Sequence, residues 1–546
     1  MSEWETACRH RYVVGGISVP VSADANEICK EASDRMKRKG LDPRTLHFRL
    51  YKRSVDARRR NDVRFVCSVL VGSDRPIPPH VAERAGLREL REERPAPRHG
   101  SEPIGARPLV VGMGPAGMFA ALLLAENGYR PILIDRGESV ADRVETVRRF
   151  REEGILESES NVQFGAGGAG TFSDGKLVTR IHDPLCGYVL ETFARFGAPE
   201  EILTLAKPHI GTDILQKVVA AILDRIAALG GTVLYRCRMD GFDRMADGTL
   251  TVHTTKGDLS CGAVILAVGH SARDTYRMLI EGQFAVEAKP ISVGVRAEHL
   301  QSDVDRALYG SFAGHPNLGH AEYAFSDTTR ERGVYTFCMC PGGEVVAAAS
   351  EEGGLVVNGM SDHARSGRNA NAAVAVSLSV RDYEPVNGSA ALGAIELQRR
   401  IERAAFRVGG GDYFAPVMTL GDLLNGTRGT DPSRVQPSYR GGRVRVCDLT
   451  QVFPDYVTDY LRFAFRSFGK KMAGFDAPDT VLTAAETRTS APLRILRDAG
   501  TLTAVGQDRI YPCGEGAGYA GGITSAAVDG LRAAIALINR FGGPET

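Results

Sequence analysis

Two cysteines and a histidine are the side chains of this chain best suited to redox or proton-transfer chemistry. Cys338 and Cys340 stand two positions apart, and residues two apart in a strand face the same side, so we expect one environment for both thiols. Such a pair can exchange electrons through a disulfide; the alternative is two small buried hydrophobic side chains. The spacing lacks the second ligand pair of a metal site, so no metal is predicted. His270 either donates a proton at a cofactor or only ends a turn.

A glycine-rich turn near residue 112 predicts the cofactor that this chemistry needs. The apolar run 109–111 reads as a buried strand, and a helix is expected over about 116–127. In this arrangement Gly112 permits the tight turn, Gly114 lets a pyrophosphate approach the backbone, and Gly117 lets the helix pack on the strand. The free N–H groups of the helix N-terminus suit a diphosphate. The predicted contacts are Gly112, Gly114, Pro115, Ala116 and Gly117.

An acidic residue follows the next predicted strand, over 131–134. Asp135 is placed there to accept hydrogen bonds from a ribose 2′-hydroxyl, which fits FAD or NAD but not NADP. Arg136 beside it is included in the predicted site. The sequence therefore predicts a dinucleotide without a 2′-phosphate.

Three later glycine-rich segments favour FAD over NAD. The loop 163–176 has backbone N–H groups free to line a flavin or its diphosphate, because few Cβ atoms block a close approach. A strand over 263–268 ends at a glycine, and the segment 510–522 precedes a helix over about 525–539, whose N-terminus suits a reduced, negatively charged flavin ring. Further helices are expected over 140–153 and 213–229. The contacts predicted here are Gly165, Gly167, Gly168, Ala169, Ser173, Gly175, Lys176, Gly269, Gly514, Glu515, Gly521 and Gly522.

The electron donor stays open in the sequence. No second G-x-G-x-x-G follows a credible strand, so no dedicated nicotinamide domain is expected. Electrons would come from a small-molecule substrate, from NAD(P)H that docks transiently, or from a protein donor. No residue marks a covalent attachment site, so the FAD is expected to be bound non-covalently.

Beyond these glycine segments, five further stretches carry a resemblance to a known family. They are 52–58, 170–177, 337–343, 358–361 and 486–490. With them the chain resembles, over nearly its whole length, the uncharacterised FAD-dependent dehydrogenases of bacteria, within the flavoprotein class that has two dinucleotide-binding domains. The resemblance implies FAD and a redox role, but no substrate.

The predicted fold class is α/β. It has a Rossmann-type FAD-binding domain of discontinuous segments, an inserted α+β substrate domain and a small N-terminal α/β module of ferredoxin-like type. In that module we expect strands over 12–14, 17–21, 46–51 and 63–71, a helix over 25–39, and a helix over 80–91 leading into the linker. The expected domains are the N-terminal module 1–90, the linker 91–106, the FAD-binding parts 107–288 and 480–546, and the inserted domain 289–479.

Composition narrows the function classes. The net charge of +1 predicts no general attraction to polyanions, and no apolar run approaches the ~20 residues that span a bilayer. Ten scattered cysteines and an N-terminus without signal-peptide layout favour a cytoplasmic enzyme. The N-terminal module nevertheless contains a cluster of basic residues. These are Arg49, Lys52, Arg53, Arg58, Arg59, Arg60 and Arg64.

The leading interpretation is an FAD-dependent oxidoreductase that transfers a hydride between FAD and a small organic substrate. One alternative is a flavin-dependent enzyme that modifies RNA and grips it with the basic module. A solvated basic face, or an interface with the acidic remainder of the chain, is favoured over that grip, because few aromatic side chains interleave the arginines. The other alternative is a non-catalytic FAD-binding redox sensor or scaffold.

Overall fold

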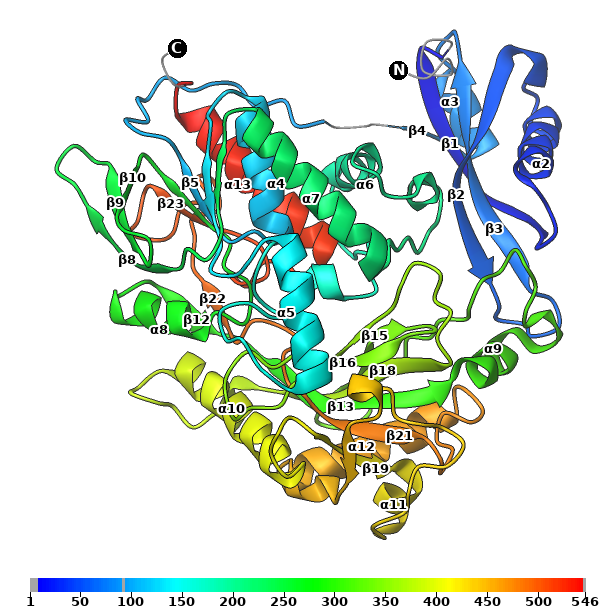
Figure 1. Cartoon of the computed structure of the whole chain (residues 1–546). Helices are drawn as coiled ribbons and strands as arrows, with labels where there is room; N and C mark the ends of the chain where they lie inside the picture. The colour runs from blue at the N-terminus through cyan, green and yellow to red at the C-terminus, as the bar shows by residue number, and fades with distance from the viewer. Residues whose placement is uncertain (1–7, 91–93, 544–546) are drawn as a thin grey trace. The chain divides into compact units, whose positions relative to one another are not determined.

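The computed structural model describes residues 8–90 and 94–543, which form two compact units (Figure 1). The first unit contains the N-terminal part up to Arg94, together with His182–His209 and Ser302–Ala321. The second contains the rest of the described chain. The two added segments had been assigned to the FAD-binding and inserted domains, so the N-terminal unit draws on more of the chain than its first ninety residues.

The first unit is built on a four-stranded antiparallel sheet in the order β2-β3-β1-β4. The predicted strands 12–14 and 17–21 form one strand, β1, whose pairing with β3 is irregular between Val14 and Ile17. The predicted helix 80–91 ends at Ala85, because Gly86 has a left-handed φ of 71° and the chain then pairs with β1; Arg91 lies outside the described residues. The elements in chain order are β1 (His10–Pro20), α2 (Ala25–Arg38), β2 (Leu46–Asp56), β3 (Arg64–Ser73), α3 (Pro79–Ala85), β4 (Leu87–Glu89) and, from a later segment, α6 (Leu185–Arg195).

A five-stranded parallel sheet in the order β23-β11-β5-β6-β7 organises the first half of the second unit. The predicted strand–helix–strand segment after residue 108 is confirmed, as are the expected helices at 140–153, 213–229 and 525–539, within a few residues. The elements are β5 (Leu109–Val111), α4 (Pro115–Glu126), β6 (Ile132–Ile134), α5 (Val140–Glu153), α7 (Thr212–Ala228), β7 (Thr232–Leu234), β11 (Val264–Leu266), α8 (Arg273–Glu281), β23 (Ile510–Pro512) and α13 (Ile523–Arg540).

Helix α4 is apolar on every side because other elements surround it. Its residues from Ala116 to Ala125 are all buried, and it lies beside α13 and α7 (Figure 1). Gly530 of α13 allows the closest approach, since a Cβ there would overlap the carbonyl oxygen of Ala116. A helix from the late sequence is thereby held against the first turn of α4.

A seven-stranded mixed sheet in the order β14-β15-β18-β13-β21-β19-β20 forms the rest of the second unit. Strand β21 lies inside this sheet, between β13 and β19, although the sequence boundary at 479 had assigned it to the final FAD-binding part. The strands are β13 (Ile291–Leu300), β14 (Ser326–Asp327), β15 (Val334–Cys340), β18 (Asn369–Leu378), β19 (Ala415–Thr419), β20 (Val444–Val446) and β21 (Val481–Glu486).

Smaller elements connect and cover these two sheets. The chain passes between them through the antiparallel pair β12–β22, and a three-stranded sheet, β8-β9-β10, follows β7. The smaller elements, in chain order, are β8 (Met239–Arg244), β9 (Leu250–Thr254), β10 (Leu259–Cys261), β12 (Val286–Ala288), β16 (Glu344–Ala347), β17 (Val357–Met360), α10 (Ala390–Val408), α11 (Leu420–Asn425), α12 (Asp455–Gly469) and β22 (Leu493–Ile495).

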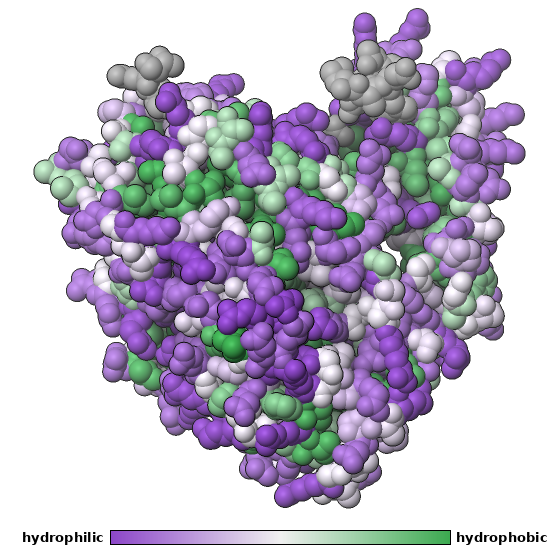
Figure 2. All heavy atoms as spheres, in the orientation of Figure 1, coloured by the Kyte–Doolittle hydropathy of each residue, from purple (hydrophilic) through white to green (hydrophobic). Residues whose placement is uncertain are grey.

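The face shown in Figure 2 is predominantly polar. Figure 2 shows hydrophilic residues over most of the coloured part of the viewed face, with apolar residues in smaller patches. Within residues 8–90 and 94–543, every helix is too short or too polar to traverse a lipid bilayer.

Candidate FAD site

A cavity of about 350 Å³ lies in the second unit, where the strands of the parallel sheet end. Val111, Ala267 and Gly514 line it and stand at or just after the carboxyl ends of β5, β11 and β23. This is the edge at which open parallel sheets bind their ligands. Residues from the seven-stranded sheet, among them Cys338 and Glu486, line the same cavity.

The G-x-G-x-x-G turn supplies a bare helix N-terminus to this cavity. Gly114 is the N-cap of α4 and makes no side-chain capping bond; Pro115 and Ala116 follow it in the lining. Gly112 has a φ of 103°, and a Cβ there would overlap the carbonyl oxygen of Ala267. Gly117 faces Gly112 instead of the cavity, where it lets the helix pack on the strand. The first N–H groups of α4 are therefore available to an anionic ligand.

Asp135 ties the turn to the end of β6. One carboxylate oxygen accepts the N–H of Met113 at 2.8 Å, and the other accepts the N–H of Gly137 at 2.8 Å. The carboxylate also lines the cavity, as does Arg136. Because each oxygen can accept a second bond, Asp135 retains capacity for a ligand hydroxyl.

The glycine-rich loop divides into residues that line the cavity and residues that hold the loop in place. Gly168, Ala169, Ser173 and Lys176 are in the lining, whereas Gly165, Gly167 and Gly175 are not. A Cβ on Gly168 would come within 2.9 Å of the Cα of Gly114, so the loop backbone lies directly against the turn. Gly167 donates its N–H to the carbonyl of Met113 at 2.8 Å.

A second helix N-terminus, that of α13, opens on the same cavity. Gly522 is its N-cap, has a φ of 127° and makes no side-chain capping bond. A Cβ on Gly521, Gly522 or Gly269 would meet nothing within 4 Å, so these positions are open toward the cavity that they line. Gly514 donates its N–H to Asp529 at 2.7 Å, which fixes the preceding loop on α13. Two positive helix ends thus converge on one space.

The titratable groups in the cavity are strongly perturbed. Burial raises the pKa of Glu486 to about 7, and burial likewise raises the pKa of Glu515 to about 7. His270 behaves oppositely: burial, and then the nearby Arg488 and Arg273, lower its pKa to about 4. Its Nδ1 lies 2.9 Å from the hydroxyl of Ser271. At neutral pH His270 is therefore neutral, and the two carboxyl groups are the ones poised to gain or lose a proton.

A bulge breaks the alternation expected around the two cysteines. The pairing of β15 with β18 shifts between Phe337 and Cys340, and Cys338 has a φ of 45°. Cys338 lines the cavity and is half-buried, whereas Cys340 is buried outside the lining. The two thiols therefore differ in exposure, whereas a regular strand predicted one environment for both; the Sγ of Cys340 lies 3.3 Å from the carbonyl oxygen of Cys338.

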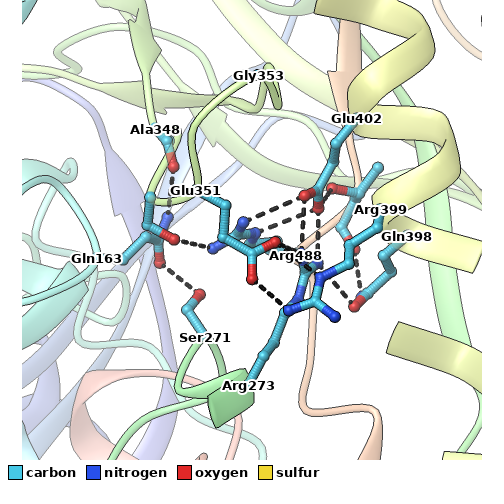
Figure 3. Close-up of polar contacts among 12 residues, drawn as sticks. Gln163, Ser271, Arg273, Ala348, Glu351, Gly353, Gln398, Arg399, Glu402 and Arg488 are labelled. Carbon is cyan, nitrogen blue, oxygen red and sulfur yellow. Dashed lines mark hydrogen bonds and ion pairs between the residues drawn. The ribbon is translucent and has the colours of Figure 1, made fainter. Parts of the chain in front are cut away.

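A buried ion-pair network fastens the loop after β21 to α8 and α10 (Figure 3). Glu402 is 1% exposed; its carboxylate accepts from Arg273 at 2.7 Å and from Arg488 at 3.2 Å. Glu351 accepts from Arg273 at 2.7 Å and bridges it to Arg399. Since Arg488 lines the cavity, this network positions one part of the cavity wall.

Several lining residues escaped the sequence prediction. Three of them follow β7, and three lie just before or in the first turn of α8. They are Cys237, Arg238 and Met239, and Ser271, Ala272 and Thr275. Applying the parallel-strand rule to the end of β7 would have found the first three, because that end lies at the same sheet edge.

Comparison of the sequence with known proteins shows which protein family this chain belongs to. Residues 290–489 match the family described as "FAD-dependent protein, C-terminal domain-like", and residues 16–72 match a domain of unknown function, DUF8436. An uncharacterised protein of Clostridium beijerinckii is 43% identical over 538 residues, which cover 97% of this chain and 99% of that protein. The first match agrees with the predicted cofactor, and none of the three specifies a dehydrogenase.

Solved structures resemble the chain only distantly. CtdE in complex with FAD is 9% identical, with a TM-score of 0.31 and coverage of 79% of this chain and 83% of that one. The halogenase PltM is 10% identical, with a TM-score of 0.33 and coverage of 79% and 68%. Similarity at this level does not establish a shared function.

Proposed function

This chain belongs to the same family as the uncharacterised Clostridium beijerinckii protein, and we propose that it is an FAD-dependent oxidoreductase. It binds FAD non-covalently in the cavity at the end of the parallel sheet and transfers a hydride between this cofactor and a small organic substrate. FAD supplies the two-electron chemistry. The protein supplies orientation, electrostatics and proton transfer.

One observation carries the proposal: the two uncapped N-termini of α4 and α13 face the same cavity. A ligand that satisfies both must carry negative charge in two places. The diphosphate of FAD suits the turn at Gly114 and Gly168, and its flavin ring, which becomes anionic on reduction, suits the glycines at 521 and 522. Asp135 then serves a ribose hydroxyl.

Side chains of the seven-stranded sheet would face the substrate. Glu486 is 4% exposed, and its Oε2 finds no hydrogen-bond partner among the described residues. With a pKa of about 7, it can hold or release a proton at that oxygen near neutral pH. Neutral His270 can accept a hydrogen bond or donate one without adding charge. These two residues are the proposed proton-handling groups.

Two measurements on the purified protein test the proposal. We expect an oxidised-flavin absorbance band, or stoichiometric reconstitution with FAD, and release of intact FAD on denaturation. The protein is then titrated anaerobically with NADH and with NADPH. Bleaching of the band identifies a nicotinamide donor, whereas a band that persists directs the search to organic substrates and protein donors. A colourless protein that cannot be reconstituted with FAD would refute the proposal.

A further inference from the structure

We propose that Cys338 and Cys340 are a reversible dithiol–disulfide pair that exchanges two electrons with the redox cofactor of the cavity. The identity of that cofactor rests on the proposed function. The existence of the pair rests on the local geometry of β15 and can be tested without a cofactor.

The bulge in β15 gives the two thiols unequal positions. Cys338 is at the cavity, while Cys340 lies behind it with 0% exposure, and its Sγ is 3.3 Å from the carbonyl oxygen of Cys338. One thiol thus faces a partner in the cavity, and the other is placed to close a bond behind it.

Two cations hold the backbone of the bulge. Arg296, which is 0% exposed, donates from Nη1 to the carbonyl of Cys338 at 3.1 Å, and Lys176 donates to the carbonyl of Met339. Both cations favour a thiolate at Cys338, which is the reactive form in thiol–disulfide exchange. A core cysteine pair would have no need of buried positive charge.

Several buried polar atoms around the bulge are not hydrogen-bonded within the described residues. Arg296 Nε lies 3.5 Å from Glu486 Oε2, and neither atom has a hydrogen-bond partner among the described residues. Both side-chain polar atoms of Asn371 are likewise buried without a partner within that part of the chain. This unsatisfied polar shell can adjust to a change of charge at the sulfur atoms, which a saturated hydrogen-bond network resists.

The acidities of the thiols agree with this geometry. The hydrogen bond from Cys340, together with Arg296 and Lys176, lowers the pKa of Cys338 to about 6, and the pKa of Cys340 is raised. Burial raises the pKa of Cys261 to about 12, and burial also raises that of Cys513. A raised pKa is what burial alone gives a cysteine in the core. The pKa of Cys338 is instead lowered.

The redox step balances in both directions. On oxidation, the Cys338 thiolate and the Cys340 thiol lose two electrons and one proton, and one bond forms between their sulfur atoms. The two electrons and that proton would pass to the oxidised flavin, which gives its anionic reduced form. On reduction, the same bond breaks, Cys340 recovers its proton and Cys338 is released as the thiolate.

Cysteine mapping tests the pair independently of flavin. The protein is equilibrated in glutathione buffers of increasing oxidation, alkylated, digested and analysed by mass spectrometry. We expect the peptide containing positions 338 and 340 to lose two hydrogens and escape alkylation, and to recover both thiols with a reductant. C338S should abolish the loss, while C447S, at a half-buried cysteine outside the cavity lining, should leave it unchanged. A pair that stays alkylatable in every buffer would overturn the proposal.

Reductive titration then tests the exchange with flavin. Oxidised protein is titrated anaerobically with dithionite while the flavin band is followed. We expect four electrons per flavin for the wild type and for C447S, and two for C338S and C340S. Two electrons for all four proteins would overturn the exchange. A protein that binds no flavin but forms the bond reversibly would refute the proposed function and support the pair, so the two failures are distinguishable.

Discussion

Where the parallel sheet ends, a group of glycines presents bare backbone to the cavity, whereas the seven-stranded sheet and the segments next to it contribute polar, charged and thiol side chains. We call these the backbone wall (Gly114, Gly168, Gly269, Gly521 and Gly522) and the side-chain wall (Cys338, Asn358, Glu486 and Arg488). The backbone wall offers open space and backbone groups to a ligand, and its glycines bring no ionisable side chain. The side-chain wall places charge in a buried space and must balance it. Substitutions should therefore fail in different ways on the two walls.

The largest loss of stability is expected at Glu402, in the ion-pair network that holds Arg488 of the side-chain wall. E402Q removes the buried carboxylate that Arg488 and Arg273 share and leaves Arg273 with Glu351 alone, and breaking a buried ion pair costs roughly 3–5 kcal/mol of the free energy of unfolding. The matched control is E396Q on the same helix, since the Glu396 side chain is 40% exposed and lies 4.0 Å from Arg403. Denaturant unfolding measures both. Equal, small losses for the two variants would contradict the role assigned to the network.

A pH-dependent effect is expected at Glu486. Its pKa is raised from 4.5 to about 7 in the folded protein, so the folded state binds the proton more tightly than the unfolded chain does. This stabilises the fold fully below pH 4.5, and the stabilisation is lost as the pH rises through 7. E486Q resembles the neutral form at every pH. We expect it to match the wild type near pH 4.5 and to gain roughly 3 kcal/mol on it at pH 8–9.

Unfolding free energies measured at several pH values check this expectation. E396Q, at a partly exposed carboxyl group outside the cavity lining, is measured alongside as the control. A difference between E486Q and the wild type that does not change with pH would show that Glu486 is ionised throughout.

A smaller effect is expected on the backbone wall. At Gly114, φ is −72°, and an added Cβ meets only the Cα of Gly168 at 3.9 Å, so G114A should fold normally. The new methyl group occupies the space that a pyrophosphate needs, and FAD affinity should fall at least about tenfold, which is 1.4 kcal/mol. Equilibrium binding of FAD measures this. G187A, at a site with nothing within 4 Å, is the control; equal affinities for both variants would contradict the placement of the cofactor.

The sequence indicates the local backbone requirements of the backbone wall, but not the contacts that position the side-chain wall. Positions such as Gly112 and Gly522 carry a local requirement, a positive φ or a forbidden Cβ, and this requirement is visible in a short pattern. Arg273 and its partner Glu402 are 129 residues apart in the sequence, and no local sequence pattern predicts such a pair. The bulge at Cys338 and the assignment of β21 to the inserted sheet likewise depend on register with distant strands.

The segments that join the first unit were missed for the same reason. His182–His209 and Ser302–Ala321 carry no glycine pattern or charge run that links them to the N-terminal sheet. Local periodicity predicts elements, and only long-range contacts decide which unit an element joins.

The close contact between Gly530 and Ala116 has a consequence for the order of events during protein synthesis. Helix α4 emerges from the ribosome early, but its neighbour α13 follows only after the whole seven-stranded sheet has been made. At ordinary elongation rates this interval lasts tens of seconds. During it, the apolar surface of α4 that faces α13 is uncovered and the second helix end is missing. Cofactor capture should therefore be a late event in the biogenesis of this protein, after the translation of residues 523–540.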